Sequence, residues 1–444
     1  MHIVSAEIAN IRIIEHMRWS IEGLASPTGW HVFLGPNGSG KSTLLRAIAL
    51  ALVGPQNAAA LRQDWRDWIS SGAVLGSCTL YYNDDGAYWD PVAGRGPRAN
   101  KYYPVVALEL KRLEDGIVEL GGRGATNYKK LAPGSNVWGS GPGWFSASYG
   151  PFRRLRGGDK EAEKLYYSHP RLARHLTVFG EDIALSECLT WMQGLRFAQL
   201  EAERMGQPDG GASGQLLARL FAFVNQKGFL PHGARLVEVS QKHVTFRDAN
   251  ENEIAVSELS DGYRSILSLT FELIRQLSLA YPEHEIFDPQ NPTKIVAPGV
   301  VLIDEIDAHL HPSWQVRIGK WFVESFPNMQ FLVTTHSPLV CQAAVKGSVY
   351  RLPRPGSGEE GRMVLGDELN RLLYGDILEA YGTESFCMMD TRSREGEMKL
   401  QRLAELNIKR LDEGLDPTEE VERAQLRRAL PVHQDDLFEE GGDA

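Results

Sequence analysis

The 444-residue sequence has few cysteines, no long apolar run and fewer basic than acidic residues. Its four cysteines lie far apart, and none has a neighbour at the spacing of a zinc site or a redox motif, which indicates reduced thiols. No apolar stretch approaches the length of a membrane span, and the N-terminus lacks the charged and apolar regions of a signal peptide. These absences predict a soluble, cytoplasmic protein that does not contact a membrane.

The charge balance limits the kinds of partner. Lysine and arginine number 47 against 57 aspartates and glutamates, so the formal net charge is −10. This balance argues against broad coating of nucleic acid but leaves room for a local basic patch. With 43% hydrophobic residues the chain can bury a sizeable core, and its length predicts two or three structural units.

The first informative motif is a glycine-rich loop between an apolar strand and a helix, in HVFLGPNGSGKSTLLRAIALAL. Glycines let such a loop wrap so that backbone N–H groups face phosphates, while Lys41 reaches the β- and γ-phosphates and the Ser42 hydroxyl binds Mg²⁺. Because strand and helix flank the loop on the required sides, the motif predicts an ATP site rather than a turn that binds nothing. The predicted nucleotide-binding residues are Asn37, Gly38, Ser39, Gly40, Lys41, Ser42 and Thr43.

The second motif, APGVVLIDEIDAHLHPSWQ, is an apolar run typical of a strand buried on both faces, and it ends in two acidic residues. We expect Asp304 to hold Mg²⁺ through water and Glu305 to polarise the attacking water. An alternative takes Asp304, Asp307, His309 and His311 as a transition-metal site. Their spacing does not repeat on one helical face, and an upstream phosphate loop explains the acidic residues better.

A third motif, MQFLVTTHSPLV, brings a histidine to the end of another predicted buried strand. Ligands of open α/β folds gather at that edge, so His336 can hydrogen-bond the γ-phosphate or the water that attacks it. A lone histidine is about as often structural. The position of His336 after the first two motifs favours the functional interpretation.

The fourth motif, LSDGY, opens a helix whose apolar residues recur at i, i+3 and i+4. The N-terminus of a helix is suited to anions, because unpaired backbone N–H groups and the helix dipole both face outward there. We therefore expect Ser260, Asp261 and Gly262 to form an anion site.

In this order, GPNGSGKS, LSDGY, VVLIDE and VTTHS resemble the ATPase head of ABC-type proteins of the AAA class, in the branch shared with SMC and RecF heads. The resemblance implies an α/β fold, a P-loop NTPase with a mixed or parallel sheet and flanking helices. It also implies an assembly of at least two heads, in which Ser260 and Gly262 of one contact the γ-phosphate of ATP held by the loop of the other. Glu305 and His336 would be the catalytic residues, and Ser42 and Asp304 the metal ligands.

The chain also departs from that pattern. Transport proteins of the ABC type carry a glutamine at the strand that leads into their helical lobe, and no clean equivalent is found here. That place is taken by WFSASYGPFRRLRGG, where Arg153, Arg154 and Arg156 follow a turn. These arginines are either solvated or contact phosphate, of nucleotide or of nucleic acid. No sustained heptad pattern is present, so a long coiled-coil arm is not expected.

The motifs divide the chain into a head with insertions. The first lobe of the head is predicted at 1–110, an inserted loop and helical lobe at 111–230, and the second lobe at 231–355. A C-terminal helical section follows at 366–434, and an acidic tail at 435–444 is expected to be solvated unless it binds a basic partner. The helices predicted in the C-terminal section span 369–383, 394–414 and 416–430.

The stretches DEIDAHLHPSWQ, YGPFRRL and LLYGDIL are similar to the ATPase of Septu-type anti-phage defence systems and its retron-linked relatives. That resemblance covers nearly the whole chain. It implies a separate HNH endonuclease as partner, since this sequence shows no nuclease motif of its own. Nucleic acid would then be contacted through that partner or through the Arg153–Arg156 turn.

Two other classes remain open from the sequence. A RecF-like DNA-repair ATPase is permitted by the basic turn and disfavoured by the net acidity. A transporter ATPase is disfavoured by the absent glutamine and by LSDGY in place of LSGGQ.

Overall fold

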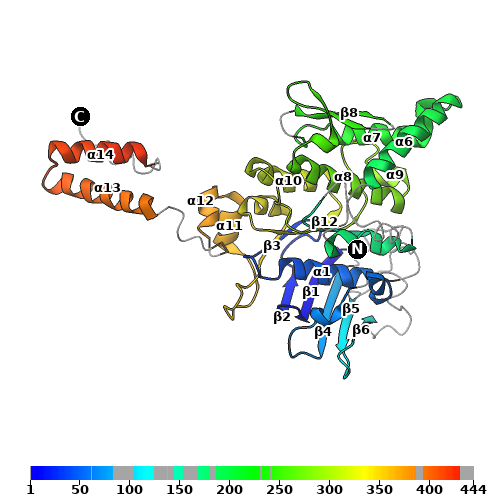
Figure 1. Ribbon diagram of the computed structural model, residues 1–444, viewed down its shortest axis with the longest axis horizontal. Helices are drawn as coiled ribbons and strands as arrows, with labels where there is room; N and C mark the ends of the chain where they lie inside the picture. Colours follow the sequence, from blue (N-terminus) through cyan, green and yellow to red (C-terminus); the bar gives the residue numbers. More distant parts are fainter. Residues whose placement is uncertain are drawn as a thin grey trace. The chain divides into compact units, whose positions relative to one another are not determined.

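The computed structural model divides the chain into two compact units, residues 1–386 and 387–444 (Figure 1). The residues that the structure describes are 2–61, 63–83, 105–124, 138, 145–153, 168–180, 187–230, 233–240, 243–383, 385–386 and 394–430.

Six strands form the central sheet of the first unit. They are β3 (Gly29–Leu34), β7 (Ser146–Tyr149), β11 (Gly299–Ile303), β12 (Met329–Thr335), β13 (Gly347–Arg351) and β14 (Arg362–Met363). The order is β14-β13-β3-β12-β11-β7, and all neighbours are parallel except β13 and β14. β3, β11 and β12 are buried along their whole length, which explains the continuous apolar runs in the sequence.

The two faces of this sheet belong to different cores. Val301 and Ile303 face a core that includes α8 (Asp261–Ala280) and α10 (Pro312–Ser325). Val300 and Leu302 face a second core that includes α1 (Lys41–Val53). Nearly every residue of α1 is buried, as expected of a helix that is apolar all round. The helix that follows the phosphate loop is therefore held firmly.

A second, antiparallel sheet covers the other side of α1. Its strands are β1 (His2–Ile11), β2 (Ile14–Ser20), β4 (Leu75–Asn83), β5 (Val105–Arg112) and β6 (Val118–Gly124). The order is β2-β1-β4-β5-β6, so β6 extends this sheet beyond residue 110, where the first lobe was predicted to end. The short helices α2 (Pro55–Ala58), α4 (Pro170–Ala173) and α5 (Leu176–Phe179) belong to the same half of the unit, as do the 3-10 turns Ala59–Leu61 and Trp65–Trp68.

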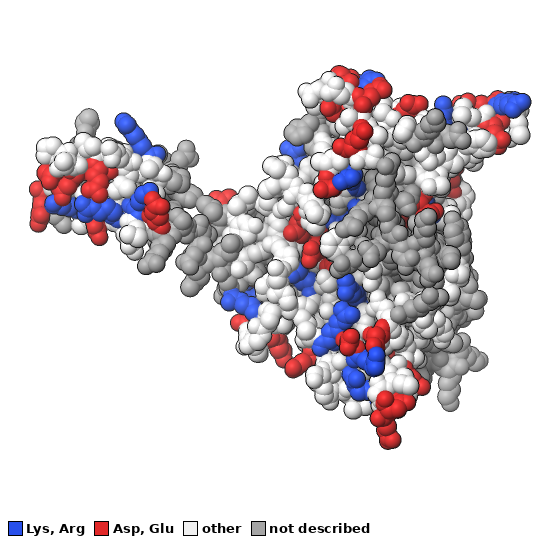
Figure 2. Space-filling view, in the orientation of Figure 1, with Lys and Arg blue, Asp and Glu red and all other residues white. Residues whose placement is uncertain are grey.

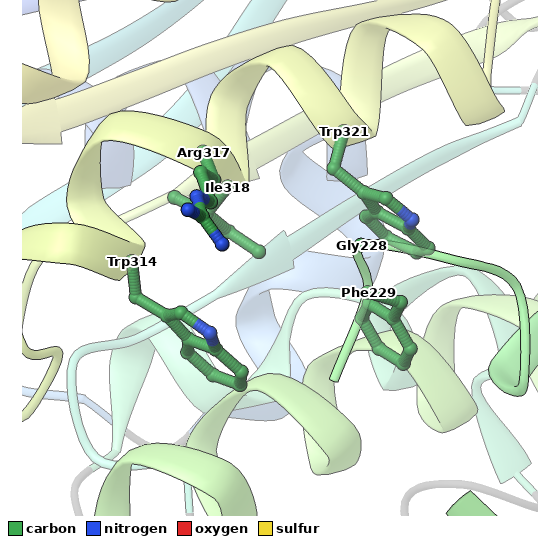
Figure 3. A pocket seen from close by; sticks show the side chains of 6 residues that line it. All are labelled: Gly228, Phe229, Trp314, Arg317, Ile318 and Trp321. Atoms are coloured by element: carbon green, nitrogen blue, oxygen red, sulfur yellow. The ribbon is translucent and has the colours of Figure 1, made fainter. Parts of the chain in front are cut away.

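The helical region packs on the opposite side of the central sheet (Figure 1). It contains α6 (Glu187–Arg204), α7 (Gly211–Val224), α9 (Glu283–Ile286) and a small sheet of β8 (Arg235–Val239), β9 (Val244–Arg247) and β10 (Glu253–Ala255), with 3-10 turns at Pro208–Gly210 and Val256–Glu258. Phe229, which follows α7, stacks on Trp321 of α10 with ring centroids 4.1 Å apart (Figure 3). This aromatic contact packs the helical region against the head.

The stretch 369–383, predicted as one helix, forms two. α11 (Gly366–Tyr374) ends before Gly375 and α12 (Ile377–Tyr381) follows. The break is stabilised by a reciprocal cap, in which the Asp376 N–H donates to Glu379 Oε2 at 3.0 Å and the Glu379 N–H donates to Asp376 Oδ1 at 2.8 Å. Both helices lie in the first unit, next to the 3-10 helix Pro338–Lys346, whereas the sequence grouped them with the C-terminal section.

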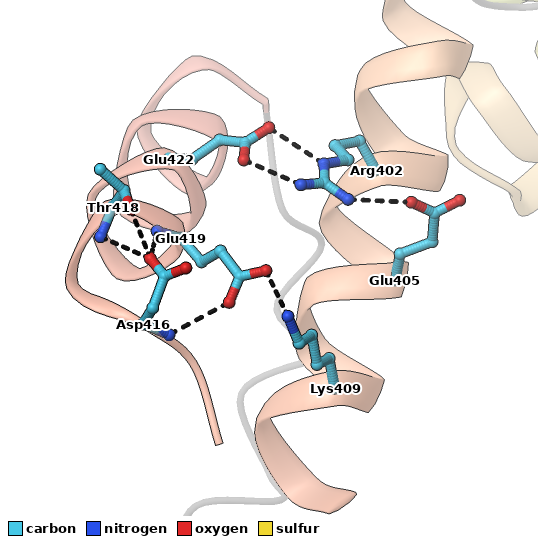
Figure 4. Close-up of polar contacts among 7 residues, drawn as sticks. All are labelled: Arg402, Glu405, Lys409, Asp416, Thr418, Glu419 and Glu422. Carbon is cyan, nitrogen blue, oxygen red and sulfur yellow. Dashed lines mark hydrogen bonds and ion pairs between the residues drawn. The ribbon is translucent and has the colours of Figure 1, made fainter. Parts of the chain in front are cut away.

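The second unit is a helical hairpin of α13 (Arg394–Asp412) and α14 (Pro417–Ala429). Asp416 accepts the N–H groups of Thr418 and Glu419, so the predicted cap of the last helix is confirmed. Arg402 and Lys409 of α13 pair with Glu422 and Glu419 of α14 at 3.0 and 2.5 Å (Figure 4). The acidic tail predicted at 435–444 lies outside the described residues.

Acidic and basic side chains interleave over the face of the molecule shown in Figure 2. Where Lys and Arg gather on this face, Asp and Glu lie among them. Such mixing gives no broad field of one sign over the described residues of this face.

Gly319 sets the distance between α10 and the strand behind it. A Cβ atom there would lie 2.5 Å from the Cβ of Ala343 and 2.9 Å from the indole ring of Trp30. We expect Gly319→Ala to destabilise the protein by about 1–3 kcal/mol through overpacking, although alanine suits a helix better than glycine. Gly194→Ala in α6 is the matched control, because no atom lies within 4 Å of its added Cβ, and it should stabilise by about 0.5–1 kcal/mol. Thermal unfolding midpoints measure both, and shifts of the same sign would contradict the packing argument.

Candidate functional site

The phosphate loop joins β3 to α1 at one edge of the central sheet. Gly38 and Gly40 have φ of 80° and 93°, in the left-handed region that favours glycine. A Cβ atom at Gly35 would lie 2.3 Å from Ser39 Oγ. The first N–H groups of α1 have no acceptor inside the helix, so they are available to an anion. This geometry supports the predicted phosphate site, whose other residues are Asn37, Lys41, Ser42 and Thr43.

Lys41 is buried at the start of α1. Its Nζ donates to the carbonyl oxygens of Gly35 at 2.8 Å and Pro36 at 3.0 Å, and it lies 3.5 Å from Nδ1 of His336. Burial lowers the pKa of Lys41, and the nearby carboxylates of Glu305 and Asp304 oppose that shift. The ammonium group thus lies between the phosphate loop and the strand ends that carry the acidic residues and the histidine.

One hydroxyl group holds both acidic residues that follow β11. Thr334 Oγ1 of β12 donates to Oδ1 of Asp304 at 2.6 Å and accepts the backbone N–H of Glu305 at 2.8 Å. Glu305 has a φ of 46°, which is uncommon for a residue with a side chain. The chain therefore turns sharply at Glu305, and neighbouring groups must hold it in that conformation.

The oxygen atoms at the end of β11 fit a magnesium ion. Asp304 is fully buried, and its Oδ2 has no hydrogen-bond partner among the described residues. A buried carboxylate oxygen is costly unless a donor, a water or a cation binds it. Mg²⁺ prefers oxygen ligands, and Ser42, the other predicted ligand, lies in the first turn of α1 beside Lys41. Asp304 and Ser42 remain the candidates to hold the ion.

His336 directly follows β12, and Asp307 holds its backbone. The His336 N–H donates to Oδ2 of Asp307 at 3.3 Å. Burial and, next, the charge of Lys41 lower the pKa of His336. Both effects favour the neutral imidazole, and a bond donated by Lys41 to Nδ1 would leave the ring proton on Nε2. Such an N–H can donate to an anionic ligand.

The LSDGY segment lies at the N-terminus of α8, where the sequence placed it. Ser260 and Asp261 are exposed, and the Ser260 side chain makes no capping bond. A Cβ atom at Gly262 would lie 2.8 Å from the carbonyl oxygen of His309, so the turn is closely packed on its inner side. Among the described residues, no hydrogen bond or ion pair joins Ser260–Gly262 to the phosphate loop of the same chain. Ser260 and Asp261 are therefore accessible to a ligand or to a second molecule.

Arg153 is neither solvated nor exposed to a phosphate ligand, so both interpretations of this residue are wrong. Its side chain is only 5% exposed, because the turn after β7 folds over the end of β11. The groups that accept its hydrogen bonds are the carbonyl oxygens of Gly150, Asp304 and Glu305 and the hydroxyl of Ser265. Arg154 and Arg156 lie outside the described residues. The support that this turn gave to a RecF-like DNA contact is correspondingly weaker.

The transition-metal alternative finds no support in the described part of the chain. No group of three or more His, Cys, Asp or Glu side chains there is placed to hold a metal ion. His311 instead caps α10, where its Nδ1 accepts the Ser313 N–H at 3.3 Å.

Over the described residues, no single helix has the length and apolar character that crossing a membrane requires. One bent pair, residues 41–53 and 55–61, meets the criterion by length and composition, and its first helix is the buried α1.

The sequence analysis missed two features of the site: the Thr334 hydroxyl that holds Asp304 and Glu305, and the bond from the His336 N–H to Asp307. The available signal for Thr334 is a hydroxyl residue at the end of an otherwise apolar strand. Asp307 and His336 are 29 residues apart in the chain, and no local spacing predicts their contact.

Two family models match the chain. Residues 159–342 match an AAA domain described as putative AbiEii toxin, Type IV TA system. Residues 6–85 match a second AAA domain. The second match contains the phosphate loop, and the first contains LSDGY, the acidic residues after β11 and His336.

Curated relatives match over shorter stretches. The Retron Ec83 probable ATPase of Escherichia coli is 40% identical over 105 residues, which are 24% of this chain and 18% of that protein. The Septu protein PtuA of Bacillus mycoides (strain KBAB4) is 38% identical over 94 residues, which are 21% of this chain and 12% of that protein. The match thus spans less than a fifth of the length of either relative.

Among solved structures, the SMC head bound to the C-winged helix domain of ScpA is similar with a TM-score of 0.45 and 17% identity, over 82% of this chain and 97% of that one. The two family matches thus place similarity to AAA domains at both the phosphate loop and the strand ends of an α/β fold.

Proposed function

We propose that the chain binds ATP with Mg²⁺ at this edge of the central sheet and hydrolyses it to ADP and phosphate. The observation that carries the proposal is the meeting of Lys41, at the start of α1, with His336 and the Asp304–Glu305 pair at neighbouring strand ends. One buried Asp304 oxygen there has no described partner. Phosphoryl transfer to water uses a loop and a lysine that bind phosphate, a carboxylate for Mg²⁺ and a residue that positions the attacking water, and Lys41, Asp304 and Glu305 supply these groups.

Each group at the edge suits one task. The backbone N–H groups of the loop and Lys41 bind the phosphates, and Mg²⁺ held by Ser42 and Asp304 would neutralise charge on their oxygens. Glu305 orients the attacking water and accepts its proton. His336 donates from Nε2 to the γ-phosphate.

We further propose that two copies pair head to head, so that LSDGY of one completes the ATP site of the other. The support is the exposure of Ser260 and Asp261, the close packing behind Gly262, and the absence of a described contact with the chain's own loop. The N-terminus of the 20-residue α8 would then point at the γ-phosphate held by the second copy.

The proposed biological role is control of a separate effector in anti-phage defence. Its support is the similarity to a retron ATPase and to a Septu protein, which extends over only part of each. An HNH nuclease is the effector that the Septu resemblance implies, and contact with nucleic acid would go through it.

Replacing Glu305 with glutamine tests the chemistry. Glu305→Gln should leave ATP binding near normal and slow hydrolysis by about a hundredfold or more, because general-base contributions have that size. Lys41→Ala should abolish nucleotide binding instead. Glu114→Gln removes the same charge from the exposed turn before β6 and is the matched control, with unchanged turnover. Steady-state phosphate release and equilibrium ATP binding measure these effects, and normal turnover of Glu305→Gln would remove Glu305 from the mechanism.

Mixing two inactive variants tests the paired site. Ser260→Arg places a bulky cation where the backbone must approach phosphate, and Lys41→Ala disables the loop. In a mixed pair, one site joins the intact loop of the first variant to the intact LSDGY of the second. We expect recovery of at most about half the activity per mixed pair if one site suffices.

Subunit exchange and ATP-dependent pairing must be measured alongside, because strict coupling of both sites would mask recovery. A monomer that hydrolyses ATP at full rate at high dilution would rule out a second copy as the source of LSDGY.

Phage plating on cells that carry the chain with its neighbouring genes tests the defence role. Wild type should protect, and Lys41→Ala should lose protection while the protein is still produced. Equal plating with and without the intact chain would contradict a role in defence and leave the ATPase proposal untouched.

A further inference from the structure

Arg153 is a buried cation in the turn after β7. ABC transporters carry a glutamine in the corresponding segment, and this chain has no clean equivalent of it. Burial lowers its pKa to about 10, and Asp304 makes the largest opposing contribution, so the guanidinium remains charged at neutral pH. A buried cation without partners is strongly unfavourable, so the hydrogen bonds that surround Arg153 are required for it to remain there.

The guanidinium joins three elements of the head. Nε donates to Ser265 Oγ at 2.8 Å, Nη1 donates to Gly150 O at 3.1 Å and to Asp304 O at 2.9 Å, and Nη2 donates to Glu305 O at 3.0 Å. Ser265 lies one turn inside α8, whose first residues carry LSDGY. A single side chain therefore links the start of α8, the turn after β7 and the acidic end of β11.

Glu305 is held from both sides of its backbone. Its N–H donates to Thr334, and its carbonyl oxygen accepts from Arg153, while its φ of 46° lies in the left-handed region. A residue persists in that conformation only where its surroundings fix it. Loss of the Arg153 bond would leave the carbonyl oxygen held only by the N–H of Ala308, at 3.0 Å, and the direction of the Glu305 side chain would change with the loosened backbone.

We propose that Arg153 is a positioning residue, which fixes the orientation of Glu305 and couples it to the N-terminus of α8. The inference rests on the role proposed for Glu305 in hydrolysis. Because α8 would contact the nucleotide of a second copy while Glu305 acts on the chain's own nucleotide, the Arg153 link makes the chemistry of one site respond to occupation of the other.

The planar guanidinium of arginine allows Arg153 to bind α8 and the end of β11 at the same time. Its nitrogens point in separate directions and reach Ser265 and two successive carbonyl oxygens together. The single ammonium of lysine keeps the charge but cannot span these acceptors. Arg153→Lys therefore removes the link without removing the cation.

The experiment compares Arg153→Lys and Ser265→Ala with Thr270→Val as the matched control. Thr270 is a fully buried hydroxyl residue on the same helix, and its Oγ1 has no described partner. We expect Arg153→Lys to lower kcat by about tenfold or more and to keep the ATP dissociation constant within about threefold, since water positioning and not nucleotide binding is lost. Thr270→Val should leave both quantities unchanged.

Ser265→Ala removes only the bond to α8. It should lower kcat by about threefold or more, and adding it to Arg153→Lys should produce little further loss, because both changes break the same link. Multiplied losses in the double variant would overturn the coupling. If Arg153→Lys does not fold, Ser265→Ala alone decides, and a kcat no lower than that of Thr270→Val overturns the proposal.

Hydrogen exchange at the Glu305 amide gives a readout without nucleotide. Arg153→Lys should speed exchange there by about tenfold or more while the amides of β3 stay protected. Unchanged exchange and unchanged kcat in Arg153→Lys would refute the positioning role even if wild type hydrolyses ATP. Absence of hydrolysis by wild type would instead refute the proposed ATPase, and the exchange result would still decide whether Arg153 holds Glu305.

Discussion

The parallel pairing of β12 with β3 on one side and β11 on the other is the constraint on which the site depends. In this register Thr335 lies opposite Leu34, and Val333 lies opposite Ile303, so the three strands end at one edge. The groups that follow each strand are therefore brought together without any local signal joining them. A shift of one residue would turn Thr334 to the other face of the sheet and separate it from Asp304.

The same edge concentrates buried charge. Lys41, Arg153 and Asp304 are each at most 5% exposed. The cations are held by backbone carbonyl oxygens, and the carboxylate is held by the Thr334 hydroxyl. Removing one member leaves another buried charge uncompensated, so substitutions here affect stability as well as chemistry. Controls that keep the charge or remove only a neutral hydroxyl separate the two effects.

The sequence predicts the parts of the head that depend on local pattern. The glycine loop, the apolar strands and the Asp416 cap follow from spacing and residue type, and the structure shows each where it was expected. The break at Gly375 was missed because the apolar periodicity continues across it, and the reciprocal Asp376–Glu379 cap that starts the second helix was not recognised. The α/β fold was predicted from the resemblance of four motifs, in their order along the chain, to an ABC-type head, and the structure shows an α/β fold.

Contacts between distant parts of the chain could not be predicted from the sequence. Arg153 and Ser265 are 112 residues apart, and Arg153 lies in a basic run that has the composition of a solvated loop. The role of Arg153 depends on its burial and on its hydrogen-bond partners, and neither can be read from the composition of the run. Arg153 nevertheless lies in the segment where ABC transporters carry a glutamine. That departure from the family pattern was the one local sign that this residue has a specific role.

The most direct test of head-to-head pairing around ATP is the structure of the protein with Mg²⁺ and a non-hydrolysable ATP analogue. The proposed metal site predicts Asp304 and Ser42 beside the metal ion. Head-to-head pairing predicts two heads, with the backbone N–H of Gly262 or the Ser260 hydroxyl of one copy about 3 Å from the γ-phosphate bound at Lys41 of the other. A nucleotide bound by a single head, with Ser260 in solvent and no second copy at the γ-phosphate, would contradict it.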